Sequence, residues 1–163
     1  NIGSKVAELA LALGMHVVGY DPLIPEAEIT RLGAHPVDFH LLLSRSDFIS
    51  IHVPLSAETR GFINGEALGA MKRGARLICA ARGGIIDETA LLSALESGQV
   101  AAAALDVFAK EPPGMSALVS HPRVIATPHI GAQTIESQTR ASVDIADEVI
   151  SAIKGDPLRW QID

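Results

Sequence analysis

Short apolar runs alternate with stretches of helical periodicity along nearly the whole chain, and the connections between them are short. The apolar runs predict strands at residues 16–20, 34–37, 48–53, 75–80, 100–107 and 124–126. Apolar residues at helical spacing predict helices at residues 2–13, 25–32, 39–43, 64–71, 87–95 and 134–153. Such alternation is typical of βαβ units with parallel strands. We therefore predict an α/β fold built on a doubly wound parallel sheet.

The composition fits such a fold and argues against two classes of partner. Of the 163 residues, 48% are hydrophobic and only 4% are aromatic, so the core must consist of Ala, Leu, Ile and Val, as in a parallel sheet covered on both faces. The net charge of −6, without a basic cluster, argues against nucleic acid. No apolar run approaches the roughly 20 residues of a membrane-spanning helix. We therefore expect neither nucleic acid nor a membrane as a partner.

Cys79 is the only cysteine, and it lies inside the apolar run at 75–80. A single cysteine cannot form an internal disulfide, and an apolar setting favours packing over a nucleophilic role. A free thiol in the core fits a reducing compartment, which predicts a cytoplasmic location.

Three polar residues each follow a predicted strand: Arg82, Glu111 and His129. In an open α/β sheet, the loops beyond the carboxyl ends of the strands form the ligand crevice. A fixed cation, a carboxylate and an imidazole that converge there could carry out proton-coupled chemistry on a polar substrate. This trio predicts an enzyme.

The first residues carry a partial nucleotide-binding signal. Gly3 would be the third glycine of the pattern G-x-G-x-x-G, and Asp21 follows a predicted strand 18 residues later. An acid near that position can accept hydrogen bonds from the adenosine ribose of NAD. No arginine follows Asp21 to accept a 2′-phosphate, so NAD is favoured over NADP. Spacing alone leaves a simple Asp-Pro turn equally open.

Taken together, six segments in order resemble the D-isomer-specific 2-hydroxyacid dehydrogenases. They are Asn1-Ile2-Gly3, residues 14–22, His52-Val53-Pro54-Leu55 with Thr59, residues 81–88, Asp106-Val107-Phe108 with Glu111-Pro112, and Thr127-Pro128-His129-Ile130-Gly131. The resemblance implies an NAD-dependent oxidoreductase that transfers a hydride between NAD(H) and a D-2-hydroxy acid or 2-keto acid. Residues 131–155 are most similar to the phosphoglycerate dehydrogenase branch, which implies 3-phosphoglycerate and 3-phosphohydroxypyruvate in serine biosynthesis. Hydroxypyruvate and glyoxylate reductases are the alternative.

The resemblance also implies a domain organisation. Residues 1–155 would form a Rossmann nucleotide-binding domain that lacks its first strand and the start of its phosphate-binding loop. Residues 156–163 would lead toward a substrate domain that is absent. The first strand of the family lies between the strands at 16–20 and 48–53, so two sheet edges would lose their partners. We therefore expect a fragment, an incompletely described protein, or a chain that borrows a strand from another copy.

Roles for individual residues follow from the same resemblance. Arg82 would bind the substrate carboxylate, His129 would serve as the general acid/base, and Glu111 would orient its imidazole. Asp106 would hold the nicotinamide carboxamide, and His52 would line the site without taking part in chemistry. The expected cofactor-binding residues are Ile2, Gly3, Asp21, Val53, Pro54, Thr59, Ala80, Ala81, Asp106, His129, Gly131 and Ala132. No metal ligand belongs to this set.

Two alternatives of other classes stay open at this point. One is a non-catalytic module that senses NAD, as some relatives of this fold do. The other is a structural dimerisation domain, because the family dimerises largely through its nucleotide-binding domain. Whichever of these interpretations holds, we expect the protein to be a homodimer or a higher homo-oligomer.

Overall fold

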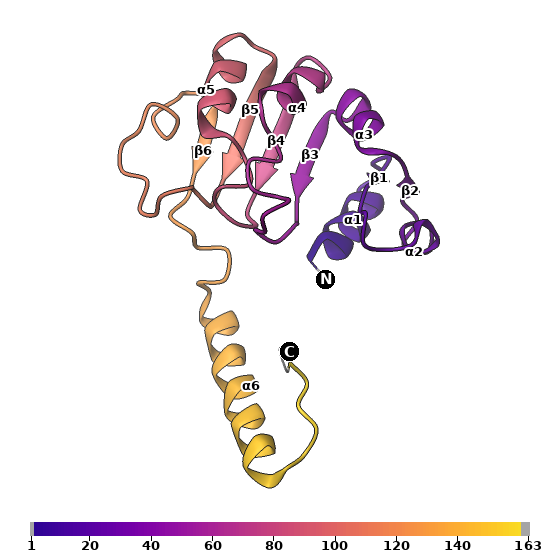
Figure 1. The fold of residues 1–163 in the computed structure, drawn as a ribbon, viewed down its shortest axis with the longest axis vertical. Coiled ribbons are helices and arrows are strands. Elements are labelled where there is room, and N and C mark those ends of the chain that lie inside the picture. Colours follow the sequence, from indigo (N-terminus) through magenta and orange to yellow (C-terminus); the bar gives the residue numbers. More distant parts are fainter. Residues whose placement is uncertain (1, 161–163) are drawn as a thin grey trace. The chain divides into compact units, whose positions relative to one another are not determined.

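The computed structural model describes residues 2–160, which form two compact units, Asn1–Pro128 and His129–Asp163 (Figure 1). The first unit contains α1 (Ile2–Ala12), β1 (Val18–Gly19), α2 (Glu26–Arg31), β2 (His35–Pro36), α3 (Phe39–Arg45), β3 (Phe48–Ile51), α4 (Gly65–Ala70), β4 (Ala75–Cys79), α5 (Glu88–Glu96), β5 (Val100–Leu105) and β6 (Val124–Ala126). The second unit contains α6 (Ile135–Lys154). The domain boundary expected between residues 155 and 156 stays a prediction.

Polar side chains at the helix starts explain why several helices begin where they do. The carboxylate of Asp38 accepts a hydrogen bond from the third residue of α3, Asn64 does the same for α4, and Asp87 for α5. The hydroxyl of Thr134 caps α6 in the same way, and Gly155 ends that helix with a left-handed φ of 75°. Each cap satisfies a backbone N–H that has no partner inside the helix. The helix predicted from residue 87 onward thus begins at its cap, Asp87.

All strand pairs are parallel, which confirms the predicted α/β class. The strands form two sheets, one in the order β1-β2 and the other in the order β3-β4-β5-β6. Residues 2–160 thus form two sheets in place of the expected single one. Among these residues, β1 pairs only with β2 and β3 only with β4, so each strand has one unpaired edge. The short ladder between β1 and β2 also explains why the strand predicted at 16–20 is reduced to two residues.

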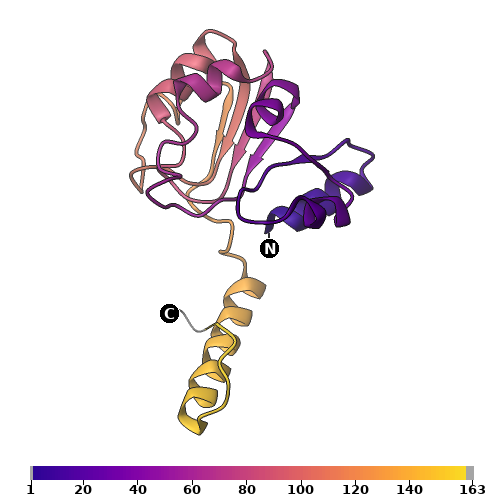
Figure 2. The same ribbon diagram turned by 45° about the vertical axis from the view of Figure 1, so that its right-hand side comes forward.

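The core lies on one face of the four-stranded sheet, under α4 and α5 (Figure 2). Leu68 of α4, Leu77 of β4 and Leu91 of α5 are each at most 1% exposed. Full burial of such a side chain contributes roughly 1.5–3 kcal/mol. These contacts anchor β4 and α5, the two elements that flank the loop at Arg82.

The opposite face of β3 and β4 is open in the described residues. Ile49 and Ile51 of β3 are buried, whereas Phe48 and Ser50 between them are exposed. The guanidinium of Arg76 lies 5.2 Å from the centre of the exposed Phe48 ring. The composition predicts a sheet covered on both faces, and the first unit covers only one.

Among the helices of residues 2–160, none combines the length and apolar character needed to cross a membrane.

Candidate active site

The carboxyl ends of the four parallel strands β3–β6 meet at one edge of the sheet (Figure 1). The loops that follow β4 and β5 carry Arg82 and Glu111. Both residues are exposed, as a substrate-binding group must be. Parallel strand order predicts that the two residues share this edge, and both loops follow strands whose carboxyl ends lie there.

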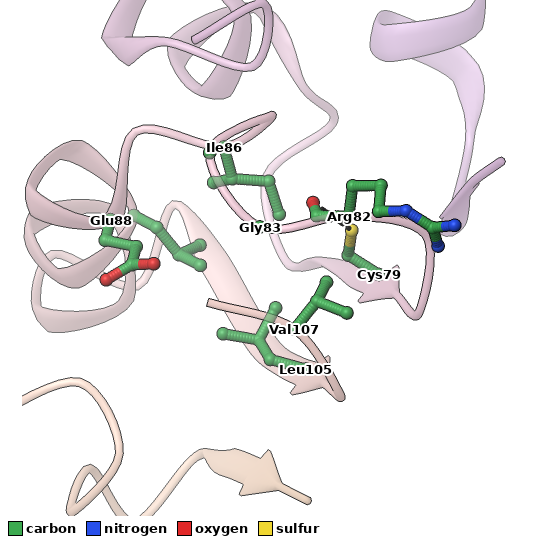
Figure 3. A pocket seen from close by; sticks show the side chains of 9 residues that line it. Cys79, Arg82, Gly83, Ile86, Glu88, Leu105 and Val107 are labelled. Carbon is green, nitrogen blue, oxygen red and sulfur yellow. Dashed lines mark hydrogen bonds between the residues drawn. The ribbon is translucent and has the colours of Figure 1, made fainter. Parts of the chain in front are cut away.

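Arg82 follows the buried end of β4, in the loop at residues 80–83. Its Nη1 donates a hydrogen bond to the carbonyl oxygen of Ala81 at 2.7 Å. The guanidinium extends away from the apolar side chains beneath the loop (Figure 3). A planar cation with several donors, held by the carbonyl oxygen of the preceding residue, is suited to bidentate binding of a carboxylate.

Gly83 brings the Arg82 loop against the loop that follows β5. A Cβ atom at this position would lie 1.8 Å from the carbonyl oxygen of Phe108 and 2.2 Å from its carbonyl carbon. Phe108 is itself buried. Only glycine permits so close an approach of two backbone segments. The loops of Arg82 and Glu111 are therefore packed directly on each other.

Two carboxylates hold the loop that follows β5. Oε1 of Glu111 accepts a hydrogen bond from the backbone N–H of Phe108 at 3.0 Å. Oε1 of Glu88, the first residue of α5, accepts one from the backbone N–H of Ala109 at 2.6 Å. Charged acceptors form stronger hydrogen bonds than neutral ones. This loop is thus ordered by side chains, although it belongs to neither a helix nor a strand.

Asp106 lies at the end of β5 and is the buried acid of the site, only 8% exposed. Its Oδ1 accepts a hydrogen bond from Oγ1 of Thr127, which follows β6, at 2.5 Å. A buried carboxylate requires such partners because removing it from water is costly. Thr127 thus connects the ends of two neighbouring strands through the acid that is expected to face the cofactor.

We expect Thr127→Val to destabilise the protein by about 1–3 kcal/mol, the usual cost of removing one partner from a buried polar group. Valine keeps the shape of threonine, so the loss would come from the hydroxyl. Urea unfolding followed by circular dichroism would measure it, with Thr127→Ser as the control that keeps the hydroxyl. Equal stability of the valine variant and the wild type would contradict this role.

A small pocket beneath the Arg82 loop has a volume of about 10 Å³ (Figure 3). It has room for about one water molecule, far below the several hundred Å³ of a ligand site. Its lining includes Cys79, Arg82, Gly83, Glu88 and Leu105. The pocket is therefore a small packing gap between the strand ends and α5, too small to be a cofactor site.

Cys79 lines this pocket and is 1% exposed. Burial raises the pKa of its thiol, which keeps the sulfur protonated and unreactive. Its Sγ lies 4.0 Å from the carbonyl oxygen of Arg82. The structure thus supports a packing role for Cys79 beneath the loop.

Gly3 and His52 lie close together at the start of α1. A Cβ atom on Gly3 would be 3.3 Å from Cβ of His52, so a glycine allows the helix to approach the chain beyond β3. Nε2 of His52 lies 2.9 Å from Oγ of Ser50, and partial burial lowers the pKa of His52. Ile2, also an expected cofactor-binding residue, is largely exposed at the same helix end.

Asp21 follows β1, as a ribose-binding acid would. Its Oδ1 accepts a hydrogen bond from the backbone N–H of Leu23 at 2.9 Å. This is the local Asp-Pro turn of the alternative interpretation. A carboxylate has two oxygens, so the turn and a ribose contact are compatible.

Thr59 shapes the loop after β3. Its Oγ1 donates to the carbonyl oxygen of Pro54 at 2.6 Å and accepts from the backbone N–H of Ser56 at 2.7 Å. Pro54 is exposed and Val53 half-buried. In the loop after β4, Ala80 is exposed and Ala81 half-buried. Their expected contacts with a cofactor stay predictions.

His129, Gly131 and Ala132 belong to the second unit, and all three are exposed. His129 adopts a left-handed backbone conformation with φ 54°. This conformation is uncommon for residues other than glycine and is frequent at functional sites. The predicted trio is thus divided between the two units, with Arg82 and Glu111 in the first.

Gly83, Glu88 and Thr127 are the positions whose contacts the sequence patterns did not reveal. In the sequence, Gly83 resembles an ordinary turn glycine, and Glu88 resembles an acid in the first turn of a helix. Thr127 stands out in the sequence only as the residue before a proline. In each case the partner lies more than 20 residues away, so local spacing carries no signal for the contact.

Comparisons with known proteins agree on one family. A family model described as "D-isomer specific 2-hydroxyacid dehydrogenase, NAD binding domain" matches residues 1–131. The chain is 48% identical over 157 residues to D-3-phosphoglycerate dehydrogenase of Bacillus subtilis, which covers 96% of this chain and 30% of that protein. It is 45% identical over 157 residues to D-3-phosphoglycerate dehydrogenase of Rattus norvegicus, with the same coverage of 96% and 30%.

Solved structures are also similar. D-lactate dehydrogenase with NAD+ from Lactobacillus jensenii matches with a TM-score of 0.91 and 32% identity, covering 99% of this chain and 52% of that one. A glyoxylate reductase from Paecilomyes thermophila matches with a TM-score of 0.89 and 40% identity, covering 96% and 48%. The chain thus spans about 30% of the length of these curated relatives and about half of these solved chains.

Proposed function

Because this chain belongs to the D-isomer specific 2-hydroxyacid dehydrogenase family and forms its NAD-binding domain, we propose that it is the catalytic and cofactor-binding part of an NAD-dependent dehydrogenase. The reaction transfers a hydride between NAD(H) and a D-2-hydroxy acid or its 2-keto acid. One observation carries the proposal: Arg82 and Glu111 lie on loops that pack directly on each other at the carboxyl edge of a parallel sheet.

The residues present fit NAD. Gly3 has no side chain where α1 approaches the chain at His52, and the buried acid Asp106 lies at the carboxyl edge of the sheet. Asp21 follows β1 and is not followed by an arginine, which favours NAD over NADP. Bound NAD supplies the ring carbon that accepts or donates the hydride.

In the proposed reaction, Arg82 binds the substrate carboxylate and stabilises negative charge on the neighbouring oxygen. His129 takes the proton from the alcohol as the hydride leaves, or returns it in the reverse direction. Glu111 orients that imidazole and stabilises its protonated form. The support for the roles of His129 and Glu111 is the match of their motifs to the family, together with the loop position of Glu111.

The substrate pair that we propose is 3-phosphoglycerate and 3-phosphohydroxypyruvate, which would place the protein in serine biosynthesis. The support is the identity of 48% to relatives named D-3-phosphoglycerate dehydrogenase in Bacillus subtilis and Synechocystis. A hydroxypyruvate or glyoxylate reductase is the second candidate, favoured by the glyoxylate reductase among the similar structures.

The test measures oxidation of NADH by the protein at its natural length. The panel contains 3-phosphohydroxypyruvate, hydroxypyruvate, glyoxylate and pyruvate, and NADPH replaces NADH in a parallel series. We expect the highest kcat/KM with 3-phosphohydroxypyruvate and NADH. Preference for hydroxypyruvate or glyoxylate would select the second candidate. NADH binding without turnover of any of the four would favour a sensor module.

The finer architecture is also part of the proposal. The two sheets would be halves of one doubly wound sheet, with a further parallel strand between the unpaired edges of β1 and β3. The protein would be a cytoplasmic homodimer or higher homo-oligomer. Exposed apolar residues on α6, among them Ile145, Val149 and Ile153, support a further packing partner for that helix.

A further inference from the structure

Glu88 lies outside the predicted trio, yet its carboxylate reaches the loop that carries Glu111. It is the first residue of α5, directly after the N-cap Asp87. Its Oε1 accepts a hydrogen bond from the backbone N–H of Ala109 at 2.6 Å, across a sequence separation of 21 residues. Glu88 is half-buried, whereas Ala109 is exposed. The contact thus connects a helix packed in the core to a loop at the surface.

This hydrogen bond acts on the backbone next to a second charged contact. The N–H of Phe108 is bound by Glu111, and the N–H of Ala109, the next residue, is bound by Glu88. The carbonyl of Phe108 is pressed against Gly83 of the Arg82 loop. The short segment at Phe108 and Ala109 is therefore held from three sides. One of these constraints comes from Gly83 of the Arg82 loop, and another comes from Glu88 of α5.

α5 is a firm support for such a contact. Leu91 and Leu95 on this helix are both 0% exposed, so the helix start cannot shift without disturbing the core. Glu88 also lines the small pocket whose other wall is the Arg82 loop, and Figure 3 shows its carboxylate on the opposite side from the guanidinium of Arg82. One rigid element thus contacts the loop of Glu111 and lines a pocket together with the loop of Arg82.

A comparison within the chain separates this contact from a general effect of acids at helix starts. Glu66 is the second residue of α4, after the N-cap Asn64, and Glu88 is the first residue of α5, after the N-cap Asp87, so both acids lie in the first turn of a helix. An acid in either place interacts favourably with the helix dipole. Glu66 is exposed and, among the residues that the structure describes, has no side-chain hydrogen bond or ion pair. The long-range hydrogen bond distinguishes Glu88.

We propose that Glu88 is a positioning residue, which fixes the loop of Glu111 against the loop of Arg82 and so sets the geometry of both side chains for hydride transfer. This inference rests on the proposed dehydrogenase function. It assigns Glu88 no contact with substrate or cofactor.

The test compares Glu88→Ala, Glu88→Gln and the control Glu66→Ala in the protein at its natural length. We expect Glu88→Ala to lower kcat by about 10- to 100-fold, the range that a small misplacement of catalytic groups produces. The KM for NADH should change less than twofold, because Glu88 does not touch the cofactor. Glu88→Gln keeps an oxygen acceptor and should restore most of kcat. Glu66→Ala should match the wild type.

Hydrogen exchange of the Ala109 amide, followed by NMR, gives a readout that needs no turnover. We expect faster exchange in Glu88→Ala than in the wild type, and wild-type protection in Glu66→Ala. Should the alanine variant fail to fold, Glu88→Gln still tests the inference, because it is expected to retain both kcat and protection of the amide.

The measurements distinguish a failure of the proposed function from a failure of the positioning role. A wild type that binds NADH but turns over no 2-keto acid overturns the proposed function, and with it the positioning role. A wild type that turns over substrate, beside a Glu88→Ala variant with unchanged kcat, overturns the positioning role alone. A loss of kcat in Glu88→Gln as large as in Glu88→Ala would also overturn it, because the acceptor would then be irrelevant.

Discussion

Replacing Gly83 by alanine is expected to destabilise the protein by about 3 kcal/mol, the upper part of the usual range for overpacking. The added Cβ would lie 1.8 Å from the carbonyl oxygen of Phe108. That neighbour is backbone, so it cannot move aside as a flexible side chain would. Relief requires separation of the Arg82 loop from the loop of Glu111. We therefore expect both a lower urea midpoint and a loss of turnover, measured on the same preparation.

Gly69→Ala is the matched control for Gly83→Ala. Gly69 lies inside α4, and a Cβ there would meet no atom within 4 Å. Alanine is favoured over glycine in a helix by roughly 0.5–1 kcal/mol, so this variant should be as stable as the wild type or more so. If Gly83→Ala were equally well tolerated, the close packing of the two loops would be refuted.

The order and type of the elements could be predicted because periodicity is a local property. The strand Val124–Ala126 appears at the residues predicted for it, and α6 begins one residue after the predicted start because Thr134 is its cap. Strand length was less predictable. β1 keeps only Val18–Gly19 of the predicted five residues, because a ladder requires a partner and, within residues 2–160, only β2 pairs with it.

The candidate site was predictable to the extent that it depends on strand order. Arg82 and Glu111 follow apolar runs, and parallel strands place such residues at one edge of the sheet. The contacts of Glu88 and Thr127 were not predictable, since each spans 21 residues and depends on how two loops are packed. Asp21 shows a third case: spacing left a local turn and a ribose contact open, and the structure shows the turn, with Oδ1 of Asp21 accepting from the N–H of Leu23.

Replacing His129 by asparagine is expected to lower turnover by about 10²- to 10⁴-fold, the usual contribution of a general acid/base. Asparagine is chosen over alanine because His129 has φ 54°, and asparagine tolerates the left-handed conformation well. The substitution therefore removes the imidazole with little added backbone strain. We expect unchanged thermal stability. His129 is also an expected cofactor-binding residue, so NADH affinity, measured by fluorescence titration, should change far less than turnover, and the excess loss of turnover then reports on proton transfer.

His16→Asn provides the control for His129→Asn, because His16 is exposed and lies before β1, at the amino end of that strand. It should retain full turnover. A His129→Asn variant with wild-type turnover would remove the imidazole from the reaction and would leave Arg82 and Glu111 as parts of a binding site. A variant with lower turnover but equally weakened NADH binding would instead assign His129 to the cofactor, because a proton-transfer role predicts a loss in kcat alone.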